Sequence, residues 1–139
     1  MAEENFLTFK KILIKNPLMA TIKLARYKFV SKMLDADDCI IDVGCGGGLS
    51  TLYYSNFCSK AIGIDNDVKR ANEWKNYKNR KLDFVCFDAL NISKLNFDAN
   101  CIINVDFIEH VSKKEGINFI KDCKHYLKNQ KNKRNKMLI

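Results

Sequence analysis

The feature that most constrains the fold is the ten-residue stretch from Cys39 to Gly48. It joins a short apolar run, an acidic residue at Asp42 and a glycine-rich turn. The apolar run predicts a buried strand, and glycines let the backbone approach a ligand where a Cβ atom would collide. A strand that leads through such a turn into a helix is typical of sites that bind a nucleoside-bearing cofactor at the carboxyl edge of a parallel sheet.

The glycine spacing favours one kind of cofactor over another. Dinucleotide-binding turns follow the pattern G-x-G-x-x-G, but here the third glycine position is occupied by Leu49. The turn instead has the pattern G-x-G-x-G, directly after Asp42 and Val43. A carboxylate at this place suits the ammonium and sulfonium charges of S-adenosylmethionine, whereas it would do little for an anionic pyrophosphate.

Three further apolar runs also end in an acidic residue. Residues 61–65, 82–89 and 101–106 predict strands that end at or near Asp65, Asp88 and Asp106. Helices are expected between the strands, so the fold class is α/β with a mainly parallel sheet and acids along one edge. Asp65 lies where an acid can accept both ribose hydroxyls. Any one of these acids could instead cap a helix.

The helical rhythm of the chain predicts five helices. They are expected over Asn5–Asn16, over Leu18–Leu34, from Leu49 onward, over Val68–Tyr77 and over Lys114–Leu127. The Asn16-Pro17 pair separates the first two. Residues 1–139 are expected to form a single domain, with amino-terminal helices over 1–34 and a Rossmann-like core over 39–139.

Taken together, these motifs resemble class I S-adenosylmethionine-dependent methyltransferases over residues 24–127. The last motif is similar to that of the ubiquinone-biosynthesis O-methyltransferases. The resemblance implies a Rossmann-like three-layer sandwich. It rests on four motifs: Ile41–Gly48, Gly63–Asp65, Phe87–Ala89 and Asp106–Val111.

The resemblance also implies a set of cofactor-binding residues. Asp42 would interact with the cofactor ammonium, Asp65 with the ribose, and Asp88 with the adenine amine beside a backbone contact from Ala89. Arg26 would reach the cofactor carboxylate, or it is a surface arginine on a helix. The full set expected to bind the cofactor is Arg26, Asp42, Gly44, Gly46, Asp65, Asp88, Ala89 and Val105.

Asp106, Glu109 and His110 follow the fourth strand at helical spacing, so a helix would place them on one face. If the methyl acceptor is a hydroxyl group, His110, with Glu109 beside it, is the candidate catalytic base. By resemblance, the same three residues could hold a divalent metal ion, since two carboxylates and an imidazole are suitable ligands. Alternatively, Glu109 and His110 only orient the next helix.

Composition narrows the cellular location and the binding partners expected of the protein. No apolar run is long enough to span a membrane, and the amino terminus lacks a signal-peptide pattern, so a cytoplasmic protein is expected. The six cysteines show no metal-ligand spacing and are expected to be reduced. The net charge of +8 invites a nucleic-acid partner, but the basic residues are not interleaved with aromatics on one face. The densest basic cluster, Lys128–Lys136, is expected to be a solvated loop.

The end of the chain bears on activity. Residues 137–139 look like the beginning of a fifth strand. The resembling family has seven strands, so we expect a truncated chain in which the fourth strand leaves an exposed edge. Three hypotheses remain open: methyl transfer to a small-molecule acceptor, which is expected to take place on an oxygen atom; a non-catalytic cofactor-binding fragment; and a nicotinamide-dependent oxidoreductase domain.

Overall fold

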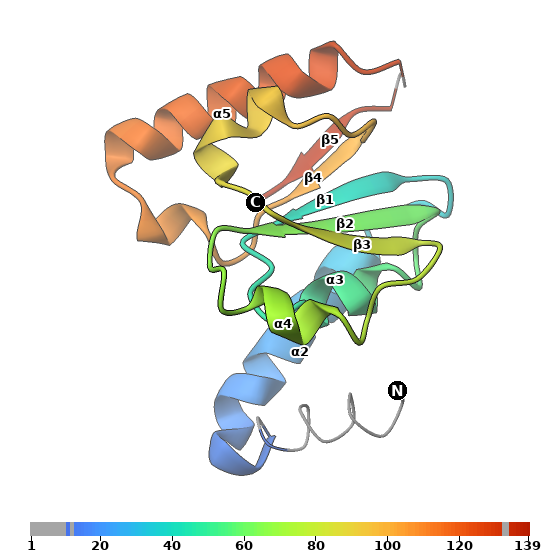
Figure 1. Ribbon diagram of the computed structural model, residues 1–139, viewed down its shortest axis with the longest axis vertical. Coiled ribbons are helices and arrows are strands. Elements are labelled where there is room, and N and C mark those ends of the chain that lie inside the picture. Colours follow the sequence, from blue (N-terminus) through green and yellow to red (C-terminus); the bar gives the residue numbers. More distant parts are fainter. Residues whose placement is uncertain (1–10, 12, 132–133) are drawn as a thin grey trace.

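A five-stranded parallel sheet forms the centre of the computed structural model (Figure 1). The structure describes residues 11, 13–131 and 134–139. All neighbouring strands pair in parallel, in the order β3-β2-β1-β4-β5. The predicted α/β class and parallel sheet are therefore confirmed. The strands are β1 (Cys39–Val43), β2 (Lys60–Asp65), β3 (Leu82–Cys86), β4 (Cys101–Ile103) and β5 (Lys136–Leu138).

The central strand is β1, which pairs with β2 on one side and β4 on the other. Ile40, Ile41 and Val43 are all buried. A strand in a parallel sheet is apolar on both faces because helices cover both faces. This is why β1 is apolar at every position except Asp42, rather than alternating between apolar and polar residues.

Helices cover the two faces of the sheet and complete three layers (Figure 1). One face carries α2 (Pro17–Ser31), α3 (Leu49–Tyr54) and α4 (Ala71–Trp74). The other face carries α5 (Lys113–Lys128) and the 3-10 segment η1 (Ala89–Lys94). Each layer contributes aromatic side chains to its own buried cluster, with Tyr54 and Trp74 in the first and Phe119 and Tyr126 in the second.

Two long helices begin at well-formed amino-terminal caps. Asn16 Oδ1 accepts a hydrogen bond from the Met19 amide at 3.1 Å, and Pro17 occupies the first turn of α2. Ser112 and Glu115 form a reciprocal capping box at the beginning of α5. Both helices therefore start within one residue of the position predicted from sequence.

Several predicted elements are shorter than expected. The helix predicted over Val68–Tyr77 is a single turn, α4, because Asp67 organises a tight turn by accepting hydrogen bonds from the amides of Lys69 and Arg70. Likewise α2 ends at Ser31, β3 at Cys86 and β4 at Ile103. The helix predicted over residues 5–16 falls mostly outside the described residues.

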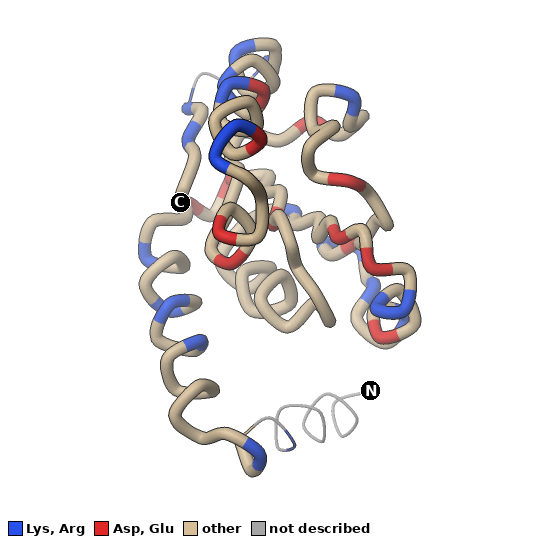
Figure 2. The backbone as a smooth tube through the Cα atoms, turned by 90° about the vertical axis from the view of Figure 1, so that its left-hand side faces the viewer, with Lys and Arg blue, Asp and Glu red and all other residues tan. Residues whose placement is uncertain are grey.

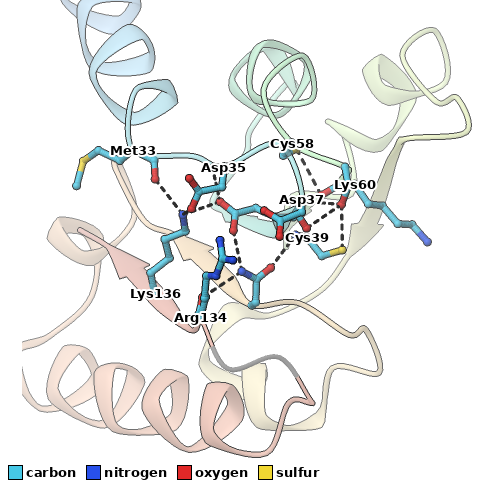
Figure 3. A network of polar contacts seen from close by, with 11 residues as sticks. Met33, Asp35, Asp37, Cys39, Cys58, Lys60, Arg134 and Lys136 are labelled. Carbon is cyan, nitrogen blue, oxygen red and sulfur yellow. Dashed lines mark hydrogen bonds and ion pairs between the residues drawn. The ribbon is translucent and has the colours of Figure 1, made fainter.

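The fifth strand is confirmed. The expectation that β4 forms an exposed edge is wrong, because β5 pairs with it. Figure 3 shows the polar network that ties β5 to the turn before β1. Lys136 Nζ lies 2.7 Å from Asp38 Oδ2 and 2.8 Å from Asp35 Oδ2. Asn100 Nδ2 donates to Asp38 Oδ1 at 2.7 Å. Because Asp38 is buried, this network anchors the amino ends of three strands.

Candidate functional site

A cavity of about 560 Å³ opens at the carboxyl ends of the central strands. The chain leaves β1 toward α3 on one face and leaves β4 toward α5 on the other, so the cavity lies at the switch point where ligands bind in open parallel sheets. Its walls come from α2, the glycine turn and the segments that follow β2 and β4. They include Lys23, Tyr27, Asp42, Gly44, Gly46, Tyr54, Asp65, Glu73, Val105, Asp106 and His110.

The glycine turn is held from both sides. The Gly44 amide donates to the Ile64 carbonyl at 2.9 Å, which fastens the turn to β2. The Gly46 amide donates to Asp65 Oδ2 at 2.9 Å, and the Gly46 carbonyl accepts from Trp74 Nε1 at 2.8 Å. Gly46 has φ +53°, and a Cβ atom there would meet nothing within 4 Å. The turn is therefore fixed in shape while its surface stays open.

Asp42 is the buried acid of the site. It is 3% exposed, and Ser50 Oγ and Thr51 Oγ1 donate to its Oδ2 at 2.6 and 2.7 Å. Burial nevertheless raises the pKa of Asp42 to about 6, because desolvation outweighs the two hydrogen bonds. A cation bound beside this carboxylate would stabilise its charged form.

The cavity has acidic and basic walls. Asp42, Asp65, Glu73 and Asp106 contribute carboxylates from the strand ends and α4. Helix α2 carries Lys and Arg but no Asp or Glu, and Figure 2 shows these basic residues along it. Of them Lys23 lines the cavity, and Arg70, just before α4, is a second basic residue of the lining. Such walls complement a ligand that carries both a cationic and a zwitterionic group.

An ion pair joins Asp106, which lines the cavity, to Arg26 of α2, which does not line it. Arg26 Nη1 lies 2.6 Å from Asp106 Oδ1, and the two side chains are 49% and 30% exposed. Exposed pairs of this kind contribute about 0–1 kcal/mol to stability, so a charged ligand can compete for either partner.

Comparison with known proteins shows the family of this chain. Residues 40–130 match the family model described as "Methyltransferase domain". The chain belongs to this family. A comparison of the methyltransferase domain with curated protein sequences found no match.

Solved structures share the fold at low identity. The superposition on the DhpI–S-adenosylhomocysteine complex structure covers 97% of this chain and 66% of that chain, with a TM-score of 0.70 and 11% identity. For the N-methyltransferase NodS from Bradyrhizobium japonicum with S-adenosylhomocysteine, the coverages are 88% and 67%, the TM-score is 0.65 and the identity 12%. For magnesium protoporphyrin IX methyltransferase from Synechocystis with bound S-adenosylmethionine, the coverages are 75% and 54%, the TM-score is 0.63 and the identity 16%. The chain thus spans about half the length of the last protein. The fold is that of class I S-adenosylmethionine-dependent methyltransferases.

The structure brings most of the predicted residues to one cavity. Val105 and His110 line it together with Asp42, Gly44, Gly46, Asp65 and Asp106. Ala89 is buried at the start of η1. Asp88 caps η1, since its Oδ1 accepts from the Leu90 amide at 3.0 Å. Arg26, Asp88 and Ala89 are not among the residues that line the cavity, although Arg26 pairs with Asp106, which is.

The segment after β4 differs from the predicted helix. Only Ile108–His110 form a turn, the 3-10 segment η2. Asp106 and His110 both line the cavity, whereas Glu109 does not, and the side chains of Glu109 and His110 are both exposed. Among the described residues, no group of three or more His, Cys, Asp or Glu side chains is placed to hold a metal ion, so the metal alternative for these residues has no support.

Sequence reasoning missed several residues of the site. Ser50 and Thr51 hold Asp42, Trp74 holds the glycine turn, and Tyr54 and Glu73 line the cavity. None of them belongs to a motif. The only available signal was that Trp74 is the sole tryptophan of the chain.

Proposed function

We propose that this methyltransferase domain binds S-adenosylmethionine in the cavity and transfers its methyl group to an oxygen atom of a small-molecule acceptor. The observation that carries the proposal is the row of carboxylates at the strand ends, with Asp42 buried against the glycine turn. They complement a cofactor with a sulfonium and an ammonium group. The same carboxylates would repel a pyrophosphate, which argues against the nicotinamide alternative.

The proposed arrangement of the cofactor follows the cavity walls. Asp65 accepts the ribose hydroxyls with lone pairs not used by the amides of Gly46 and Asp67. Asp42 attracts the ammonium, and Gly44 and Gly46 give the methionine part room.

The remaining proposed contacts lie at the two ends of the cofactor. Asp88 and Ala89 receive the adenine, so Asp88 would accept its amine in addition to capping η1. Val105 forms part of the wall. Arg26 binds the carboxylate once its pair with Asp106 opens.

The bound cofactor would supply an electrophilic methyl group, and the protein would position and deprotonate the acceptor. Methyl transfer is an in-line displacement, which depends mainly on alignment of the reacting atoms. His110 lies on the cavity wall and is proposed to take the proton of the acceptor hydroxyl. Glu109, next to it on η2, is proposed to support this role from the exposed side.

The test is transfer of radiolabelled methyl from S-adenosylmethionine to a panel of phenols, carboxylic acids and sugars. His110→Gln is expected to keep its affinity for S-adenosylhomocysteine and to lose most transfer. Asp65→Asn is expected to lose affinity. The matched control is His125→Gln, since His125 is the only other histidine and is exposed on α5. Full transfer by His110→Gln would contradict the role of that histidine.

A second candidate is a cofactor-binding domain without catalysis. It is favoured by the coverage of only 54% of the magnesium protoporphyrin IX methyltransferase, since the rest of an acceptor site can lie in the remainder. It predicts that S-adenosylhomocysteine binds but no acceptor in the panel is methylated. Measurable turnover by the purified chain would rule it out.

We further propose a cytoplasmic setting and a single domain over residues 1–139. All six cysteines lie in the described residues and are free, as is usual in a reducing compartment. Within the described part of the chain, no helix has the length and apolar character needed to cross a membrane.

A further inference from the structure

A second cavity, of about 610 Å³, is an apolar groove formed by α2 and the end of β5. Ile22, Ala25 and Phe29 line it from α2 at helical spacing, and Leu138 and Ile139 line it from the other side. Phe29 is 67% exposed and Ile139 is 64% exposed. Large apolar side chains that gather at one exposed place mark a binding surface more often than chance exposure does.

The size and lining of the groove fit a small molecule. Sites for small molecules enclose about 300–1,000 Å³ and are mostly apolar, with a few polar groups that fix the orientation of the ligand. Arg26 is the only charged residue among the described residues that line the groove. A ligand that complements these walls is therefore apolar over most of its length and carries one negative charge.

Arg26 has hydrogen-bond donors to spare for such a ligand. A guanidinium group carries five N–H donors, and here Nη1 donates to Asp106 Oδ1 at 2.6 Å. Asp106 is the only side chain among the described residues with which Arg26 makes a hydrogen bond or an ion pair. The remaining donors can bind a carboxylate, which guanidinium groups hold with paired, charge-assisted hydrogen bonds.

We infer that the groove binds a free monocarboxylic acid with a long apolar chain. The carboxylate binds Arg26, and the chain lies between α2 and the end of β5. The linings of the groove and of the cofactor cavity share only Val105 among the described residues, so this site is distinct from the proposed cofactor site. A second copy of the chain is a poorer occupant, because its net charge is +8 and its α2 has no acidic residue to pair with Arg26.

The experiment separates the contribution of the chain from that of the carboxylate. The purified chain, without S-adenosylmethionine, is titrated in a calorimeter with octanoate, decanoate and decan-1-ol. Decanoate is expected to bind at one site per chain and about tenfold more tightly than octanoate, because two more methylene groups are buried. Decan-1-ol should bind about tenfold more weakly than decanoate, since it lacks the charge that Arg26 recognises.

Two variants and their matched controls locate the site. Phe29→Ser should weaken decanoate about tenfold, whereas Phe57→Ser, at an exposed phenylalanine outside the groove, should not. Arg26→Gln should weaken decanoate to the affinity of decan-1-ol and leave decan-1-ol unchanged. Lys28→Gln removes an exposed base of α2 that does not line the groove and should bind both ligands as wild type does.

Several results would overturn the inference. These are no binding of decanoate by wild type, equal binding of decanoate and decan-1-ol, or unchanged binding of decanoate by Phe29→Ser. Equal weakening by Lys28→Gln and Arg26→Gln would also overturn it, because it would show general attraction to a basic protein. Sedimentation of wild type as a dimer that Phe29→Ser dissociates would show that a second copy covers the groove instead. Should Phe29→Ser not fold, as judged by its urea midpoint, Ile139→Ser takes its place, since that side chain is also exposed and lines the groove.

Discussion

Asp42→Asn should stabilise the folded protein while weakening the cofactor site. The pKa of Asp42 is raised from 3.8 to about 6 by burial. Between these two pH values the folded state holds a proton that the unfolded state has released, so the free energy of unfolding falls as pH rises through this window. This difference between the folded and unfolded pKa values of Asp42 corresponds to about 3 kcal/mol of stability at low pH, which is fully lost once the pH exceeds 6.

The variant isolates this effect because asparagine keeps an oxygen that can accept from Ser50 and Thr51 but does not titrate. The stability difference between Asp42→Asn and wild type is expected to grow by about 3 kcal/mol from pH 4 to pH 7. Any pH-independent effect of the asparagine amide changes the free energy of unfolding by the same amount at pH 4 and at pH 7. Urea unfolding at several pH values, followed by the fluorescence of the sole tryptophan, Trp74, measures it. Asp37→Asn, at an exposed aspartate, is the control.

Parallel stability curves for wild type and Asp42→Asn would refute this reasoning, because they would mean that Asp42 is not held in a desolvated site. The opposite effect is expected on binding. Asp42→Asn should bind S-adenosylmethionine more weakly than wild type at pH 7, since the cation loses its buried counter-charge. Increased stability with decreased affinity is the behaviour of a residue kept for its function rather than for the fold.

Three further variants test the supports of the site. Lys136→Met should lower the free energy of unfolding by about 3 kcal/mol in urea titrations, because it leaves the buried Asp38 without its cation; a loss below about 1 kcal/mol would contradict the role of the pair. Trp74→Phe should weaken S-adenosylhomocysteine binding severalfold in calorimetry, since the carbonyl of Gly46 loses a hydrogen bond of about 1 kcal/mol. Unchanged affinity would show that this hydrogen bond does not hold the glycine turn in its binding shape. Gly63→Ala should cost about 1–3 kcal/mol of stability by overpacking, as its Cβ would lie 2.6 Å from an aromatic carbon, and an unchanged thermal midpoint would refute this.

The parts of the fold that sequence predicted are those set by local patterns. The apolar run and glycine turn around Asp42 define β1 and the switch point. Residues 137–139 predicted a fifth strand, which the structure has at Lys136–Leu138. Asp65 was identified because it ends a strand at the spacing of a ribose-binding acid, and in the structure it lies in the cavity. Such signals are short-range, so one sequence is enough to find them.

The parts that sequence missed depend on contacts between distant segments. Trp74 meets Gly46 across 28 positions, and Arg26 meets Asp106 across 80. No periodicity encodes such pairs. The apolar groove illustrates the same limit, since its lining comes from α2 and β5, which are far apart in the sequence.

The most direct test of the account is a calorimetric titration of the purified chain with S-adenosylhomocysteine, with NAD⁺ as the control ligand. The cavity and its carboxylates predict binding of S-adenosylhomocysteine in the micromolar range and no binding of NAD⁺. Binding of NAD⁺ alone, or of neither ligand, would contradict the central claim that this cavity is an S-adenosylmethionine site.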